Sequence, residues 1–342
     1  MATSIDALVN KLLDIGLSRE LVDASLPEWW QADDYQSTSA RTLVSLMLAR
    51  RLNIDPSTLL DDAVPVGFLH TGPTKFKHMR LGDGPRRDAL VGFSVGVGRI
   101  LLSMLDPAGA IEVPRDPLEL RAALLAGRPL VSFGDVITAC WSLGAPLLHL
   151  RVFPAQTKGV TAIAVRQGRR HAILVARESG FEAQYMFHVA HELGHIALGH
   201  LKGTGAIIDA DPNDPANELD ELVDDEEERA ADAYAQALLT GSANFQVLRQ
   251  EGIGSAASLG TARELAARAL QMSGELGVDP GHVVMTFGYS TGEWQLANAA
   301  ARHLPQQNAK PATLVNRILW RQLDASGSDE QSAAYLKAVA PI

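Results

Sequence analysis

The sequence predicts an α+β protein that is mostly helical, with a small β-sheet or hairpin near its middle and an all-α N-terminal domain. Three observations lead to this fold class. Apolar residues recur at helical spacing over residues 1–62, and two short apolar runs flank a Gln-Gly-Arg turn at Gly168. Three more segments with helical spacing follow, at 182–201, 220–239 and 261–276.

Length and composition exclude several classes of protein. The chain has 342 residues, of which 46% are hydrophobic and 20% are charged, so it is too apolar to be disordered. Its one cysteine, Cys140, excludes a disulfide framework and any zinc site with several thiolates. No uninterrupted apolar run reaches ~18 residues, and the N-terminus lacks the pattern of a signal peptide. We therefore expect a soluble cytoplasmic protein without a membrane partner.

The negative charge is concentrated in one stretch. The formal net charge is −10, and twelve carboxylates but only one base lie between Gly205 and Asp232. The rest of the chain is therefore close to neutral. This acidic stretch is expected to be a solvated loop, or to attract a basic protein partner.

Residues 1–110 are predicted to form the helical N-terminal domain. The stretch from Ser39 to Leu59 is similar to helix-turn-helix modules of XRE-type repressors. The domain holds eleven bases and thirteen acids, however, which is a poor electrostatic footprint for DNA binding. The six bases between Lys75 and Arg99 are interpreted as a solvated surface.

Prolines and a glycine mark the next boundary. They are Pro107, Gly109, Pro114 and Pro117, and residues 111–130 are predicted to form a linker. The predicted α+β domain then covers 131–300, and residues 301–342 form a helical C-terminal extension.

The strongest chemical signal lies in the helix predicted at 182–201. Residues 191–195 read His-Glu-Leu-Gly-His. Four residues on a helix bring His191 and His195 to one face, where both imidazoles can reach one Zn²⁺ at ~2.0–2.1 Å. Glu192 can act as a general base toward a water molecule at the metal. The alternative is a pair of ordinary helix histidines, but the amphipathic helix and the small Gly194 favour a zinc site.

A catalytic zinc needs a third protein ligand. A metzincin would have glycine at 198 and histidine at 201, where this chain has Leu198 and Leu201. His200 is out of register, and it is interpreted as a histidine that interacts with the negative end of the helix dipole.

The acidic start of the helix predicted at 220–239 offers a different third ligand. Glu228 can ligate the metal, while Asp232, on the same helix face, accepts the free N–H of a ligand histidine. Glu226 and Glu227 remain competitors, because spacing alone cannot choose among three adjacent glutamates.

Residues 131–239 resemble the ImmA/IrrE family of zinc metallopeptidases. The shared pattern is a helix and strand before a hairpin, then Phe-x-Val-Ala-His-Glu-Leu-Gly-His, then Glu-x-x-Ala-Asp. The resemblance implies a zincin-like, gluzincin-type metallopeptidase core at 131–300, with His191, His195 and Glu228 as zinc ligands and Glu192 as base. It also implies cleavage of XRE-type repressors. The family often has Leu-Leu-Met-Pro where this chain has Leu-Leu-Thr-Gly at 238–241.

Further candidates surround this core. Tyr234 and His282 are candidate donors to the oxyanion that forms during peptide hydrolysis. The hairpin around Gly168 is a candidate edge strand for binding an extended peptide.

The sequence thus predicts a zinc-dependent endopeptidase that cleaves a protein substrate. That substrate is expected to be an XRE-type repressor, whose cleavage relieves repression in a stress or mobile-element response. The alternative is a DNA-binding transcriptional regulator whose zinc domain is a sensor without turnover, so direct DNA binding stays open.

Overall fold

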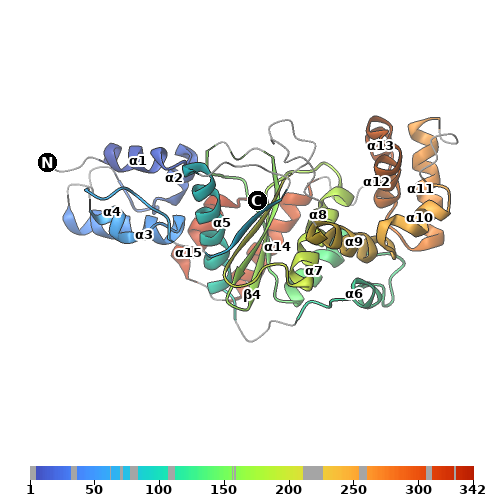
Figure 1. Ribbon diagram of the computed structural model, residues 1–342, viewed down its shortest axis with the longest axis horizontal. Helices are drawn as coiled ribbons and strands as arrows, with labels where there is room; N and C mark the ends of the chain where they lie inside the picture. The colour runs from blue at the N-terminus through green and yellow to red at the C-terminus, as the bar shows by residue number, and fades with distance from the viewer. Residues whose placement is uncertain are drawn as a thin grey trace.

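The computed structural model describes most of the chain. The residues described are 5–31, 37–61, 63–69, 72–77, 84–106, 112–155, 157, 159–210, 226–253, 260–305, 310–326 and 329–342. In these residues, helices surround one five-stranded sheet, with helical clusters at both ends of the molecule (Figure 1). The expectation of a mostly helical protein with a small sheet is confirmed.

The sheet is mixed, and its strands come from distant parts of the sequence. They are β1 (Thr74–Lys77), β2 (Leu147–His149), β3 (Val160–Gln167), β4 (Arg170–Val175) and β5 (Gly205–Ala210), in the order β1-β5-β3-β4-β2. The outer pairs, β1 with β5 and β2 with β4, are parallel, while β3 is antiparallel to both of its neighbours.

The predicted hairpin is present, but it is not at an edge. Strands β3 and β4 are joined at Gly168, whose φ of 62° is easily adopted by glycine. Strand β3 also pairs with β5, and β4 also pairs with β2. The hairpin therefore cannot offer a free edge to a peptide, and that expectation was wrong. The edges of the described sheet are β1 and β2.

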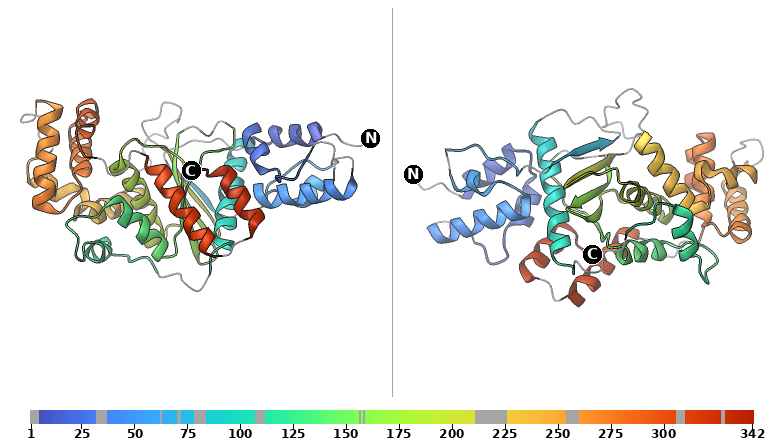
Figure 2. Two further views of the ribbon diagram at one scale, coloured as in Figure 1. Left: turned by 180° about the vertical axis from the view of Figure 1, so that it is seen from behind. Right: turned by 60° about the horizontal axis from the view of Figure 1, so that its bottom comes forward.

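Helices cover both faces of the sheet (Figure 2). Helix α5 (Pro85–Ser103) packs on the face that presents Ile163 and Val165. A Cβ atom on Gly98 would lie 2.7 Å from Val165 Cγ1, so glycine permits the close approach of α5. The opposite face presents Ile173 and Val175 to a core that also holds residues of α7 (Phe133–Ser142), α8 (Glu182–Leu198) and α9 (Glu226–Thr240), with α9 packed against α8.

The N-terminal helices extend the core on the α5 side. They are α1 (Ile5–Asp14), α2 (Arg19–Ser25), α3 (Thr38–Leu52) and α4 (Pro56–Leu60). The stretch similar to a helix-turn-helix thus folds as α3 and a five-residue α4, joined at Asn53 in the left-handed conformation. The buried Arg51 donates to the carbonyl of Ser25 at 2.9 Å and to that of Gln331 at 3.1 Å.

The C-terminal helices α14 (Pro311–Ser326) and α15 (Glu330–Val339) also belong to this core. The side chain of Asn316, in α14, accepts the N–H of His149 at 2.8 Å and donates to its carbonyl at 2.9 Å. The central domain therefore shares one core with strand β1, helix α5 and helix α14. The domain boundaries predicted from the sequence, at 110 and 301, separate these three elements from it. Local periodicity shows that a helix has an apolar face, but not which sheet that face covers.

The predicted linker contains a helix, α6 (Pro117–Leu124). Its buried Arg121 donates to the carbonyls of Leu238 and Leu239 at the end of α9, at 3.0 and 2.9 Å. The remaining helical elements share a separate small core at the far end of the molecule. They are η3 (Ala243–Phe245), α10 (Gln246–Gln250), α11 (Ala262–Leu276), α12 (Pro280–Thr291) and α13 (Trp294–Ala301). None of the helices described is long and apolar enough to cross a membrane.

Candidate metal centre

Helix α8 carries the His-Glu-Leu-Gly-His motif, buries one face in the core and ends at a glycine. Tyr185, Val189 and Leu193 are fully buried in the core shared with α7 and the sheet. The helix ends at Gly199, whose φ of 72° is the left-handed conformation common after helix C-termini. Helix packing therefore places the motif without the help of a metal ion.

Gly194 lets α9 approach the motif closely. A Cβ atom at this position would lie 3.1 Å from both the Cα and the carbonyl oxygen of Ala231, which are backbone atoms of α9. Tyr234 Cβ, also on α9, would lie 3.1 Å from the added atom. Because Gly194 has no side chain, α9 packs close to α8 and its start reaches the two motif histidines.

Three buried side chains converge at this point. His191 Nε2 lies 3.0 Å from His195 Nε2 and 3.3 Å from Glu228 Oε2, while His195 Nε2 lies 3.1 Å from Glu228 Oε1. Ligands bound to one ion at ~2.0–2.1 Å in a tetrahedron are separated by about 3.3 Å. The spacing and the donor atoms therefore fit a metal ion, and this group could hold one.

The structure also distinguishes the three adjacent glutamates. Glu226 is exposed, and Glu227 pairs with Lys75 at 2.6 Å and with Lys77 at 3.3 Å. Glu228 is the one whose carboxylate lies with the two histidines.

Each histidine has a partner on its other ring nitrogen. Asp232 Oδ1 lies 2.9 Å from His191 Nδ1, and His200 Nδ1 lies 2.8 Å from His195 Nδ1. If His191 and His195 each donate an Nδ1 proton to these partners, both Nε2 lone pairs face the centre of the group. The interpretation of His200 as a helix-end histidine missed this contact, which forms only because the chain turns back at Gly199.

Glu192 is fully buried beside the same group. Burial raises the pKa of its carboxyl well above the usual range, His191 opposes this, and the carboxylates of Asp209 and Glu228 add to it. Burial alone would lower the pKa of His191, but hydrogen bonds to Asp232 and Glu228 outweigh it and hold that pKa well above its ordinary value. The group thus combines carboxylates and imidazoles whose charges depend strongly on one another.

Sequence reasoning missed two residues near the group. Asp209, on β5, places Oδ2 3.9 Å from His191 Nε2 and accepts a hydrogen bond from Thr161 Oγ1 at 3.2 Å. Lys77, on β1, is buried and places Nζ 3.5 Å from Glu228 Oε1. The interpretation of the bases from Lys75 onward as a solvated surface is therefore wrong for Lys77. The spacing of Lys75 and Lys77 puts both on one side of a strand, but nothing local connects them with Glu228.

Tyr234 does not turn its hydroxyl toward the group. Its oxygen donates to the carbonyl of Pro114 at 2.9 Å, which is outside the metal-binding set. A role as oxyanion donor therefore has no geometric support in this structure.

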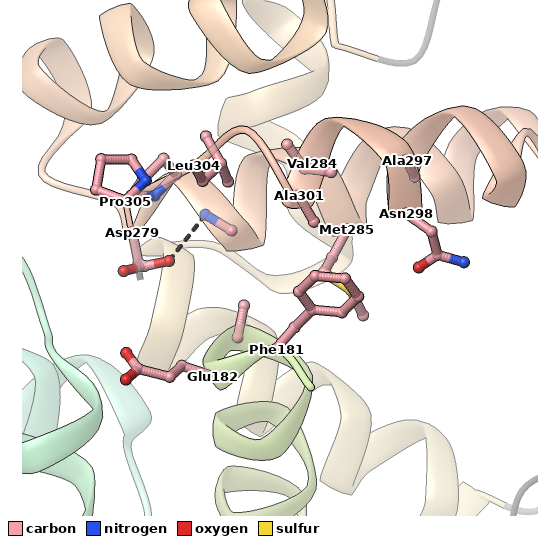
Figure 3. Close-up of a pocket in the computed structure, with 13 residues that line it drawn as sticks. Phe181, Glu182, Asp279, Val284, Met285, Ala297, Asn298, Ala301, Leu304 and Pro305 are labelled. Carbon is pink, nitrogen blue, oxygen red and sulfur yellow. Dashed lines mark hydrogen bonds between the residues drawn. The ribbon is translucent and has the colours of Figure 1, made fainter. Parts of the chain in front are cut away.

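His282 lies near the start of α8 instead. It follows Gly281, where a Cβ atom would lie 2.6 Å from Ala183 Cβ. Figure 3 shows the pocket at this junction, with Phe181 and Glu182 opposite Asp279, which accepts the N–H of Gly281 at 2.8 Å. Ala183 precedes His191 by eight residues, about 12 Å along a helix. The contact of Gly281 thus places this part of α12 at the opposite end of α8 from the three grouped side chains.

An aromatic row leads away from the metal-binding group. The ring of Phe187 lies 6.3 Å from that of His191 and 6.2 Å from that of Tyr289, centroid to centroid. Tyr289 in turn stacks on Phe245 at 5.9 Å and meets Trp294 edge-on at 4.8 Å. Half of Tyr289 is exposed, so the row forms an apolar rim beside the group.

Comparisons with protein families, with curated proteins and with solved structures gave no match to this chain.

Proposed function

We propose that this protein is a zinc-dependent endopeptidase of the gluzincin type, with His191, His195 and Glu228 as metal ligands and Glu192 as general base. The observation that carries the proposal is the buried Glu192 next to three donor atoms spaced as a tetrahedral metal site requires. Two imidazoles and one carboxylate are a typical ligand set of catalytic zinc, which leaves one position open for water or substrate.

Zinc in such a site supplies a Lewis acid that polarises a peptide carbonyl and lowers the pKa of water. The side chains of the protein supply the rest. Glu192 takes the proton from the attacking water and passes it to the leaving amine. Asp232 and His200 hold the two ligand histidines in the tautomer that directs Nε2 inward.

The proposed substrate is an XRE-type repressor in the cytoplasm, as the resemblance to the ImmA/IrrE family implies. The aromatic row from Phe187 to Tyr289 suits an apolar side chain of an extended polypeptide. The acidic stretch between Gly205 and Asp232 suits a basic, DNA-binding partner. Most of that stretch, residues 211–225, lies outside the described residues.

The test is the Glu192→Gln variant. Purified protein is expected to bind one zinc per chain and to cleave an XRE-type repressor encoded near it, with the fragments identified by mass spectrometry. Glu192→Gln should keep zinc and lose about 10²- to 10⁴-fold in kcat/KM, because the amide cannot take a proton.

Glu226→Gln is the matched control, because Glu226 is an exposed carboxylate at the start of α9. It should leave zinc content unchanged and lower cleavage far less than Glu192→Gln, because it removes only one of the twelve carboxylates of the acidic stretch. Full cleavage by zinc-loaded Glu192→Gln would refute the proposed base, and a wild-type protein that binds no metal would refute the whole proposal.

A further inference from the structure

The ammonium group of Lys77 is buried beside a proposed metal ligand. The side chain is only 6% exposed, and Nζ lies 3.5 Å from Glu228 Oε1 and 3.3 Å from Glu227 Oε2. A buried ammonium is costly unless it is paired, and Lys77 forms ion pairs with these two carboxylates. The position of Lys77 and the position of the Glu228 carboxylate therefore depend on one another.

A second lysine of strand β1, Lys75, contacts neighbours of the metal-binding group and none of its three members in the contacts described. Its ammonium lies 2.6 Å from each oxygen of Glu227 and donates to the carbonyl of His200 at 2.8 Å. His200 is the partner of His195. Lys75 and Lys77 thus connect the edge strand both to the start of α9 and to the turn after α8.

The charges of this cluster balance. Lys75, Lys77, Glu227 and Glu228 together carry no net charge, so Lys77 does not stand as an isolated cation beside a metal ion. A carboxylate that binds a metal through one oxygen can still pair with a neighbouring cation. Such a cation fixes the orientation of the ligating carboxylate. Without Lys77, the adjacent carboxylates of Glu227 and Glu228 would repel each other, and Glu228 could turn away from the histidines.

We propose that Lys77 is the positioning residue of the third metal ligand, so that metal affinity depends on strand β1, which lies outside the stretch that resembles the peptidase family. The inference rests on the metal group of the proposed function, but not on turnover. Strand β1 pairs with β5 from Thr74 to Lys77, with Lys77 opposite Asp209. Any change that separates β1 from β5 would therefore also release Glu228.

The test is metal binding by Lys77→Met in the full-length protein. Affinity for Zn²⁺ is measured by competition with a chromophoric chelator, and ligand geometry by the visible absorption of the Co²⁺-loaded protein. We expect Zn²⁺ affinity to fall by about 10- to 100-fold, the usual effect of removing a partner of a metal ligand. The Co²⁺ spectrum should also change, which a general loss of stability would not produce. Lys77→Arg, which keeps the charge, should restore most of both.

Lys75→Met is the matched control, since Lys75 lies on the same strand but is 36% exposed and pairs with Glu227 rather than Glu228. It should change Zn²⁺ affinity much less than Lys77→Met. Wild-type affinity with an unchanged Co²⁺ spectrum in Lys77→Met would overturn the inference, and so would tighter Zn²⁺ binding by Lys77→Met. A loss of Zn²⁺ affinity in Lys75→Met as large as that in Lys77→Met would also overturn it. If Lys77→Met does not fold, Lys77→Gln takes its place with the same expectations. A wild-type protein that binds no metal would instead refute the proposed function.

Discussion

At the scale of single residues, the chemistry of the site depends on which nitrogen of each histidine carries a proton. Asp232 Oδ1 lies 2.9 Å from His191 Nδ1, and a carboxylate at that distance favours a proton on Nδ1 and a lone pair on Nε2. Asp232 is itself nearly half exposed, with 47% of its side chain accessible, so it contributes little to the buried core. Its expected effect on metal binding comes from the contact with His191.

The corresponding prediction concerns Asp232→Asn. The amide keeps the size of the side chain but can present an N–H to His191 Nδ1, which favours the wrong tautomer. Zn²⁺ affinity should fall by about 10- to 100-fold. Competition with a chelator measures the change, and Glu226→Gln on the same helix serves as control. Equal affinities for wild type and Asp232→Asn would show that Asp232 does not orient His191.

At the scale of elements, the site exists because α8 and α9 lie close together. Gly194 faces backbone atoms of Ala231, and Glu228 lies one turn earlier on α9. An added methyl group would press on backbone, which cannot turn aside as a flexible side chain can.

Gly194→Ala is therefore expected to cost about 1–3 kcal/mol of unfolding free energy through overpacking. It should also weaken Zn²⁺ binding, because α9 moves away from the histidines. Urea unfolding with and without Zn²⁺ measures both effects. Gly274→Ala in α11 is the control, since a Cβ atom added there would meet no atom within 4 Å and helix propensity alone should stabilise it by roughly 0.5–1 kcal/mol. A stable Gly194→Ala protein with normal Zn²⁺ affinity would show that the close contact is not needed.

The same scale bears on the alternative of a DNA-binding regulator. In the stretch similar to a helix-turn-helix, α3 has fifteen residues but α4 has only five. Five residues make fewer than two helical turns, which is short for a helix that reads the major groove. Direct DNA binding stays a prediction, and no feature of α3 or α4 adds to it.

At the scale of the whole molecule, buried histidines make stability depend on pH. His149 and His282 are each 2% exposed, and burial lowers the pKa of both to about 4 from an ordinary value of 6.5. Between these pH values the unfolded chain binds more protons than the folded one, so folding is favoured by higher pH. The contribution is complete above about pH 6.5 and is lost as the pH falls toward 4.

The free energy of unfolding should therefore fall by up to about 3 kcal/mol per buried histidine over this interval. Urea unfolding at several pH values, with a chelator present so that metal release does not contribute, measures the slope. His282→Gln should reduce the pH dependence of the unfolding free energy by the contribution of one histidine, whatever the variant does to stability at neutral pH. A slope that is the same in wild type and variant would mean that His282 is not buried in its neutral form.

The sequence by itself determined the residues that share a helix. His191, Glu192 and His195 follow from helical periodicity, because neighbours on a helix have a fixed geometry. The Asp232 contact was also predictable, since Glu228 and Asp232 are four residues apart.

Only the tertiary structure decided which of the three adjacent glutamates faces the histidines, and it added His200, Asp209 and Lys77. These residues depend on the end of a helix, on strand pairing and on the packing of α8 against α9. Such contacts join segments up to about 150 residues apart, and local sequence patterns carry no record of them. For the same reason, strand β1 and helix α14 proved to belong to the central core, although the sequence boundaries at 110 and 301 place them outside it.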